Sequence, residues 1–328
     1  MAQHTIYPLL FEPVYKTYIW GGDRIGQRYP DSHASARYAE AWEVSDRADG
    51  MSVVRNGPLS GTSLRDVLAR MGETLVGRRG EASVFPLLVK ILDANATLSV
   101  QVHPDDDSAL RYGGEAKTEA WTILEAPAGA RLYAGLTPGT DANALQAAIS
   151  EGRVEDVVRS HAVEAGDAMF VAGGTVHAVG EGLILLEVQQ NSNTTYRIHD
   201  WGRSGADGKP RDLHQEQASQ VIRWDSNPQV TKGAAESSGA AAQSLRVLVE
   251  CPYFCIHSGT LSGPLTRRHD GSTYTILFIA GGNADLSWDD EHLALPAGST
   301  VLIPAALPEW AVQPQDGPLR VILVTEPT

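Results

Sequence analysis

The sequence predicts a mainly β protein built from two jelly-roll β-barrel domains, with a few helices decorating the N-terminal one. At 328 residues the chain is longer than a single hydrophobic core usually supports. Its 32 glycines and 18 prolines suit many short strands joined by turns. The apolar segments fall in two blocks, before and after a polar stretch. We therefore expect an N-terminal domain over 1–225, a linker or exposed loop over 226–244, and a C-terminal domain over 245–328.

The predicted strands are apolar or β-branched segments bounded by turn-forming residues. They are Val84–Leu92, Leu98–Val102, Ala120–Leu124, Ala168–Ala172, Leu183–Gln189 and Thr195–Ile198 in the first block, and Tyr274–Ile279, Leu286–Trp288 and Val301–Ile303 in the second. Helical spacing occurs in three further places. Thr62–Met71 carries an apolar stripe, a helical insertion over about 139–162 joins Asp141–Ser150 to Val154–Arg159, and another helix lies within 213–223.

Composition excludes several classes of partner. The formal net charge of −14 argues against nucleic acid and anionic membranes. No apolar run approaches the ~20 residues that span a bilayer, and residues 1–10 lack the features of a secretory signal. The two cysteines, Cys251 and Cys255, are expected to be buried free thiols in a reducing compartment. We expect a cytoplasmic location and, by default, a monomer.

Three short segments carry side chains that bind metals. In Leu98–His103 the residues alternate, so Ser99, Gln101 and His103 share one strand face while Val100 and Val102 share the other with Leu98. In Lys117-Thr-Glu-Ala-Trp, Glu119 shares a face with Lys117. Glu119 follows His103 by one loop and one strand, a distance that suits an antiparallel neighbour.

The third segment is Gly166-Asp-Ala-Met-Phe-Val-Ala-Gly-Gly-Thr-Val-His177. It resembles the second metal-binding motif of the cupin superfamily, Gly-x5-Pro-x-Gly-x2-His, with Ala172 in place of proline. Glycines allow the backbone to turn tightly, so that the following histidine points into the barrel. Gln101, His103, Glu119 and His177 together offer two nitrogen and two oxygen donors. This set is typical of catalytic zinc and also suits non-haem iron.

Three cations accompany these residues. Lys90 lies in an otherwise apolar run, where an unpaired ammonium would be costly, so we expect it to point into the barrel. Lys117 shares the face of Glu119, and Arg197 lies in a strand after the glycine-rich turn. Positive charge gathered around a metal in an acidic protein would suit a phosphate ester and a developing enediolate.

The chain resembles the short bacterial form of type I mannose-6-phosphate isomerases, in the cupin superfamily, over nearly its whole length. The segments that carry this resemblance are Leu10–Gly22, Glu40–Ser45, Leu88–Ala94, Leu98–Asp106, Lys117–Trp121 and Gln190–Arg197. It implies two cupin domains and one zinc ion bound by Gln101, His103, Glu119 and His177. It also places Lys90, Lys117 and Arg197 in the substrate pocket, with Arg197 matching the active-site arginine of the family. We predict that Arg197 and Lys117 are catalytic and that Lys90, Ser99, Asn193 and Asp200 bind the substrate.

The reaction that the resemblance implies is interconversion of mannose 6-phosphate and fructose 6-phosphate through a cis-enediol. The residue that moves the proton stays open among Lys117, Glu119 and His103. One departure from the family is Asn193, where many members have aspartate, and Asp200 is a nearby substitute. In the C-terminal block the repeated motif, Gly298-x5-Pro-x-Ala-x2, ends on Glu309 instead of histidine. We therefore expect that domain to lack a metal.

Two other functions remain compatible with the residues. The first is an iron-dependent cupin dioxygenase that uses His103, His177 and Glu119, which the cations disfavour. The second is a non-catalytic sugar-phosphate-binding protein, which Asn193 alone suggests. The same isomerase chemistry on another sugar phosphate or on a free aldose is also compatible.

Overall fold

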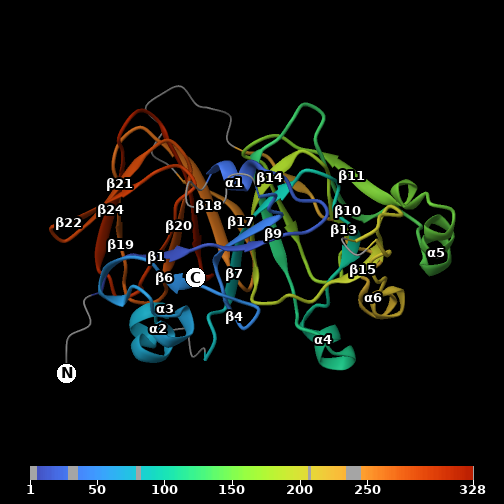
Figure 1. Cartoon of the computed structure of the whole chain (residues 1–328), viewed down its shortest axis with the longest axis horizontal. Helices are drawn as coiled ribbons and strands as arrows, with labels where there is room; N and C mark the ends of the chain where they lie inside the picture. Colours follow the sequence, from blue (N-terminus) through green and yellow to red (C-terminus); the bar gives the residue numbers. More distant parts are fainter. Residues whose placement is uncertain (1–5, 29–35, 79–82, 206–207, 234–244, 328) are drawn as a thin grey trace. The chain divides into compact units, whose positions relative to one another are not determined.

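The computed structural model describes residues 6–28, 36–78, 83–205, 208–233 and 245–327. The chain divides into two compact units that are interleaved along the sequence (Figure 1). Unit 1 contains residues 1–14, 42–87 and 234–328, and unit 2 contains residues 15–41 and 88–233. The division predicted from the sequence, with an N-terminal domain over 1–225 and a C-terminal domain over 245–328, differs from this grouping. The reason is that β1 (Leu9–Glu12) pairs with β23 (Thr300–Ile303), with Leu9 opposite Leu302.

Unit 2 has two antiparallel sheets in the part of the chain that is described. The larger sheet has the order β16 (Val230–Thr231), β12 (Ala168–Val171), β9 (Glu119–Glu125), β14 (Leu183–Gln190), β7 (Leu87–Ala94), β3 (Glu40–Val44) and β2 (Val14–Lys16). The smaller sheet has the order β11 (Val158–Ala162), β10 (Arg131–Leu136), β13 (His177–Val179), β8 (Val100–Val102) and β15 (Tyr196–His199).

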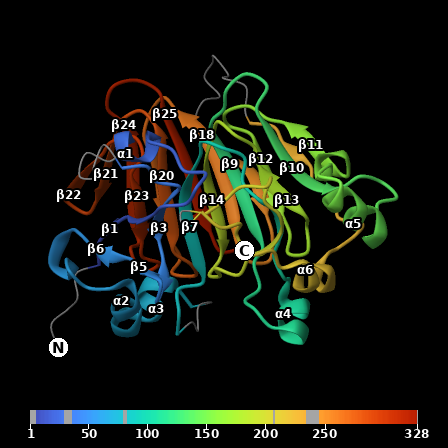
Figure 2. The same cartoon turned by 45° about the vertical axis from the view of Figure 1, so that its right-hand side comes forward.

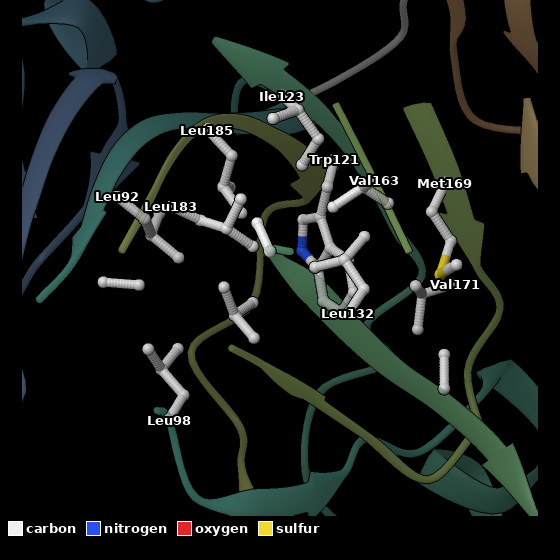
Figure 3. Packing of buried hydrophobic residues seen from close by; sticks show 14 of the residues in the cluster. Leu92, Leu98, Trp121, Ile123, Leu132, Val163, Met169, Val171, Leu183 and Leu185 are labelled. Carbon is white, nitrogen blue, oxygen red and sulfur yellow. The ribbon is translucent and has the colours of Figure 1, made fainter. Parts of the chain in front are cut away.

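An apolar cluster fills the space between these two sheets. It includes Trp121 and Leu185 from the larger sheet and Leu132 from the smaller one, and Figure 3 shows these side chains packed together. Trp121 is almost completely buried. This cluster holds the two sheets at a fixed separation, and the polar residues described below depend on that separation.

The helices of unit 2 are α1 (Arg24–Arg28), α4 (Asp106–Tyr112), α5 (Ala142–Ser150) and α6 (Gln215–Val221), with the 3₁₀ turn η2 (Val154–Asp156). Helices α5 and α6 lie beside the smaller sheet (Figure 2). Leu145 and Val221 pack there with Val100 and Val102 in a second apolar cluster. The outward face of β8 is therefore covered by helices, and the residues between, such as Gln101, face the other way.

Unit 1 also has two main sheets within its described residues. One has the order β17 (Arg246–Glu250), β18 (Cys255–Leu261), β25 (Leu319–Thr325), β20 (Thr275–Gly281), β23, β1 and β6 (Val53–Val54). The other has the order β19 (Leu265–Arg268), β24 (Glu309–Pro314), β21 (Ala284–Trp288) and β22 (Glu291–Leu295). The hairpin β4 (Asp46–Arg47) with β5 (Gly50–Met51), η1 (Gly57–Leu59), α2 (Leu64–Met71) and α3 (Glu73–Val76) complete the unit.

Most predicted elements agree with these bounds, and three differ. The helix predicted over Val154–Arg159 is wrong beyond Asp156, because residues from Val158 onward form β11 and pair with β10. Leu98 packs between the sheets of unit 2 instead of with Val100, since β8 begins only at Val100. Within the predicted linker, Val230–Thr231 form β16, and residues 234–244 lie outside the described residues.

An ion pair between Arg24 and the buried carboxylate of Asp93 stabilises the start of unit 2. The carboxylate of Asp93, whose side chain is fully buried, accepts hydrogen bonds from the backbone N–H and from Nε and Nη2 of Arg24. The same guanidinium donates to the carbonyl oxygens of Gly182 and Leu183. Arg24 thereby links α1 to β7 and to the start of β14.

No helix among the described residues is long and apolar enough to cross a membrane.

Replacing Asp93 with alanine should lower the free energy of unfolding by about 3 kcal/mol, because it leaves the guanidinium of Arg24 partly buried without its carboxylate. Urea unfolding followed by tryptophan fluorescence measures this change. The control is Glu125→Ala, which removes an exposed partner of Arg28 and should cost no more than about 0.5 kcal/mol. Equal effects of the two substitutions would contradict the assigned role of Asp93.

Candidate active site

Neighbouring strands bring the predicted metal ligands together. On the smaller sheet of unit 2, His177 at the start of β13 lies directly opposite Gln101 on β8. Paired residues of an antiparallel sheet project to the same face, so both side chains point away from the helices and toward the larger sheet. His103 follows β8 directly, and Glu119 begins β9 on the larger sheet. The ligand set therefore spans the gap between the sheets.

The glycine pair of the cupin-like motif allows this approach. A Cβ atom on Gly173 would lie 2.7 Å from Cα of Asp105, which is closer than side-chain atoms pack. Gly174 has φ of +87°, a conformation that glycine adopts readily, and its N–H donates to the carbonyl oxygen of His103 at 2.7 Å. The turn before His177 is thereby attached to the strand end that carries His103.

His103, Glu119 and His177 form one buried cluster with the geometry of a metal site. One ligand atom from each lies within 4.8 Å of the others. His177 Nε2 is 3.3 Å from Glu119 Oε1, and His103 Nε2 is 3.7 Å from Glu119 Oε2. Two ligands of a tetrahedral ion with bonds of about 2.0–2.1 Å lie about 3.4 Å apart. The distances of both imidazoles from Glu119 therefore suit a small divalent ion.

Backbone carbonyl groups hold both imidazole rings in the orientation that a metal needs. His103 donates from Nδ1 to the carbonyl oxygen of Thr194, and His177 donates from Nδ1 to that of Thr175, both at 2.8 Å. A carbonyl oxygen can only accept, so the proton of each neutral ring is on Nδ1. The lone pair on Nε2 then points at the cluster. This arrangement of an outer acceptor and an inner lone pair is usual for metal-binding histidines.

The fourth predicted ligand fits after one rotation. Gln101 donates from Nε2 to His177 Nε2 at 3.2 Å, and its Oε1 accepts from Ser99 Oγ at 3.3 Å. Turning the amide by half a revolution would aim Oε1 at the cluster and leave Ser99 as the acceptor. Both oxygens of Glu119 are buried, and the ammonium of Lys117 lies 2.6 Å from Oε2. Oε1 accepts no hydrogen bond from the described residues, and a cation would satisfy it.

A chain of buried charges extends from this cluster. Lys117 Nζ lies 2.6 Å from Glu119 Oε2 and 3.9 Å from Glu187 Oε1. Lys90 Nζ lies 3.1 Å from Glu187 Oε1 and 3.7 Å from Glu40 Oε2. The indole N–H of Trp121 donates to the other oxygen of Glu187. Lys90 and Lys117 are thus both buried beside the ligands, as their sequence positions predict.

Sequence reasoning missed Glu187 and Glu40. Glu187 is the one charge in the apolar run of β14, so it carries the same signal that identified Lys90. The resemblance to the family included Glu40 within a matching segment but gave it no role. The structure buries both carboxylates and places them on either side of Lys90.

Burial and neighbouring charges shift the pKa values of this group. Burial lowers the pKa of His177 to about 4, and it lowers the pKa of His103 well below the ordinary value, with a further contribution from Lys117. Burial also raises the pKa of Glu119 to about 7 in the absence of a metal. Burial alone would raise the pKa of Glu187 too, but Lys117 and Lys90 outweigh it and lower that pKa to about 2. Glu187 is therefore ionised, and the two imidazoles are neutral, at pH 7.

Arg197 lies on the same row as two ligands. It is directly opposite Gln101 across β15 and β8, so its side chain projects from the same face of the smaller sheet. Its Nη1 donates to the carbonyl oxygen of Asp212, while its buried Nε has no partner among the described residues. The pKa of Arg197 is lowered by burial and then by the nearby charge of Arg211.

Asp200 holds two more arginines near Arg197. Arg211 Nε donates to Asp200 Oδ2 at 2.7 Å, Arg203 Nη2 donates to Oδ1 at 2.6 Å, and Arg211 Nη2 also pairs with Oδ1. Both oxygens of Asp200 are therefore occupied by guanidinium groups. We name Arg197, Arg203 and Arg211 the arginine cluster.

The other two predicted substrate contacts lie in different surroundings. Ser99 is buried and adjoins Gln101, so the structure brings it to the ligand set. Asn193 is exposed, and its backbone N–H donates to the carboxylate of Glu115 at 2.9 Å.

Comparison with known proteins agrees with this geometry. Residues 9–122 match the model of the phosphomannose isomerase type I catalytic domain, and residues 244–325 match the mannose-6-phosphate isomerase cupin domain. The mannose-6-phosphate isomerase of Streptococcus mutans is 34% identical over 96% of this chain and 97% of its own length. This chain belongs to the type I phosphomannose isomerase family. The prediction of a mainly β cupin fold is confirmed.

Solved structures of this family superpose on the whole chain. The crystal structure of the mannose 6-phosphate isomerase from Bacillus subtilis has a TM-score of 0.86 and 30% identity, and it covers 97% of this chain and 99% of that one. A mannose 6-phosphate isomerase crystallised with zinc and yttrium has a TM-score of 0.73 at 17% identity, covering 98% of this chain and 100% of that one. The second likeness shows the shared fold.

In the metal-free protein, the ring of His177 should stay neutral as the pH falls and become half protonated only near pH 4. The unfolded chain takes up this proton near pH 6.5, so His177 alone should remove about 3 kcal/mol of stability between neutral pH and pH 4. Nitrogen-15 NMR of the imidazole rings follows the protonation directly. A midpoint for His177 near 6.5 would show that its ring is not buried as described.

Proposed function

We propose that this protein is a zinc-dependent isomerase that interconverts mannose 6-phosphate and fructose 6-phosphate through a cis-enediol. One observation carries the proposal: a buried His-Glu-His cluster adjoins two buried lysines that are bridged by the ionised Glu187. A metal site beside proton-carrying groups can move a hydrogen between neighbouring carbons of a sugar. Membership of the phosphomannose isomerase family supports the choice of substrate.

Gln101, His103, Glu119 and His177 would hold one zinc ion. Two imidazoles, a carboxylate and an amide oxygen match the donors that catalytic zinc accepts, and the related structure crystallised with zinc supports this choice over iron. When bound, the metal supplies Lewis-acid polarisation of sugar oxygens. The four ligands come from β8 and the residue that follows it, from β9 and from β13, which leaves Lys90, Lys117 and Glu187 for the sugar.

The arginine cluster is the proposed site for the phosphate group. Three guanidinium groups and the two nearby carboxylates, of Asp200 and Asp212, leave a local charge of +1 (three minus two). This local excess of positive charge would attract a phosphate dianion in a chain whose net charge is −14. Because both oxygens of Asp200 are occupied, we assign it to positioning Arg203 and Arg211 and not to direct substrate contact. Ser99 adjoins Gln101, which lies opposite Arg197, and its hydroxyl group can donate a hydrogen bond to the phosphate group or to the sugar.

Lys117 is the proposed carrier of the proton. It is the side chain that contacts both the metal-ligand cluster and Glu187. In the forward reaction a base removes the proton from C2 of the open-chain aldose, and the same proton or one from solvent is delivered to C1, while a hydroxyl proton passes from O2 to O1. Lys90, held between Glu187 and Glu40, is placed to stabilise negative charge that develops on the enediolate oxygens.

A coupled assay tests the proposal. The metal content of the purified protein is measured, and formation of fructose 6-phosphate from mannose 6-phosphate is followed before and after chelation. Turnover that is lost with zinc and restored by it would support the isomerase. Oxygen uptake with added iron and no isomerisation would instead identify a dioxygenase. Tight binding of the sugar phosphate without turnover would identify a binding protein.

Substitution of a metal ligand and substitution of Arg197 should separate zinc binding from turnover. His103→Ala should lose zinc and activity together, because it removes a ligand from the buried cluster. Arg197→Ala should keep one zinc ion per chain but lower kcat/KM about 10²–10³-fold, since it removes charge from the substrate side. Metal analysis and steady-state kinetics measure both effects. An Arg197→Ala enzyme with a near-normal rate would refute the role of Arg197.

The two buried lysines should differ when each is replaced by methionine. Lys117→Met should lower kcat about 10²–10⁴-fold and abolish exchange of the C2 hydrogen with deuterium from solvent, with zinc retained. Lys90→Met is the matched control, because it removes an equally buried ammonium from the other side of Glu187, and exchange should continue at a reduced rate. Persistent exchange in Lys117→Met would assign the proton transfer to another group.

A further inference from the structure

The two main sheets of unit 1 enclose a buried apolar cluster that includes Leu277, Leu323 and Trp310. Five polar side chains beside this cluster are linked by contacts or by charge. They are Cys255, His257, Arg267, His269 and Thr275. We name them the inner polar group of unit 1. The proposed isomerase reaction uses none of them.

Strand register places this group on the inward faces. His257 on β18 is directly opposite Leu323 on β25, and Arg267 on β19 is directly opposite Trp310 on β24. Leu323 and Trp310 both belong to the buried cluster, and paired residues share a face. His257 and Arg267 therefore project into the same interior from the two opposing sheets.

Among the described residues, no ion pair or hydrogen bond reaches the side chain of Arg267, and its Nε is buried. The neighbouring Arg268 projects from the opposite face of β19, is exposed, and pairs with Glu309 at 2.6 Å. A partly buried arginine is normally paired, and a buried polar group without a partner calls for an ion or ligand.

The residues around Arg267 leave a donor available beside it. His269 is fully engaged, because its Nε2 accepts from Trp310 Nε1 at 3.1 Å and bonds Thr275 Oγ1 at 3.0 Å, while Nδ1 contacts the carbonyl oxygen of Pro304. The ring of His257, in contrast, contacts only the sulfur of Cys255, at 3.8 and 4.0 Å, within the described residues. The pKa of His257 is lowered by burial and then by the charge of Arg267, while the charge of Glu250 raises it.

We propose that Arg267 and His257 form a binding site for a small oxyanion, the phosphate or carboxylate group of a metabolite, inside unit 1. A guanidinium presents two parallel N–H groups to such an anion, and an imidazole N–H supplies a third. The site is within reach of solvent, since Val247, opposite His257 on β17, is 46% exposed. A bound anion supplies the charge that Arg267 lacks.

Titration of the zinc-loaded full chain with inorganic phosphate, and separately with acetate, tests this proposal. Nitrogen-15 NMR of the His257 ring reports on binding at this place. We expect a saturable shift of the His257 signals, and the anion that saturates it at the lower concentration identifies the ligand class. Arg267→Gln should weaken the apparent affinity at least about tenfold, and Arg267→Lys, which keeps the charge, should weaken it less.

Two matched variants complete the experiment. Arg268→Gln removes the adjacent exposed guanidinium and should leave the His257 titration unchanged. Arg203→Gln perturbs the proposed phosphate site of unit 2 and should also leave it unchanged, so failure of the isomerase proposal would not affect this result. The proposal is overturned if His257 shows no saturable shift with either anion, or if Arg268→Gln weakens the titration as much as Arg267→Gln.

Discussion

Two lysines and three glutamates are buried together in unit 2, where an unpaired charge would cost several kcal/mol. Lys90, Lys117, Glu40, Glu119 and Glu187 alternate in sign along the network, and each ammonium contacts two carboxylates. Without a metal, burial raises the pKa of Glu119 to about 7, so this carboxyl group is partly protonated at neutral pH. A bound divalent cation would keep Glu119 ionised and would satisfy its Oε1, which accepts no hydrogen bond from the described residues. The positions of Lys90, Lys117 and Glu187 depend on these paired charges.

Much of the candidate site could be predicted from the sequence because local rules place it. Strict alternation put Gln101 and His103 on one face, and a glycine-rich turn before His177 identified the third segment. The apolar surroundings of Lys90 indicated its inward direction. The same reasoning applied to Glu187 would have found it, since a single charge in a buried strand needs a partner.

Other features depend on contacts that are distant in sequence. Asp200 looked like a substrate contact, but Arg203 and Arg211 fold back to occupy it, and nothing in the spacing of these residues shows that. The interleaving of the two units along the sequence also cannot be predicted from local sequence patterns, because the pairing of Leu9 with Leu302 spans most of the chain. The strand at Val158–Ala162 was obscured by its position directly after a helix and a 3₁₀ turn.

The pairing of β1 with β23 has a consequence for synthesis of the chain on the ribosome. Unit 2, residues 15–41 and 88–233, contains all the strands of its smaller sheet. That sheet can therefore form before the C-terminal block is made. Leu9, in contrast, pairs with Leu302, which is synthesised near the end of the chain. Until then one edge of an apolar strand is unpaired, and such an edge is prone to association with other chains. We expect slow, late folding steps to belong to the N-terminal strand despite its early synthesis.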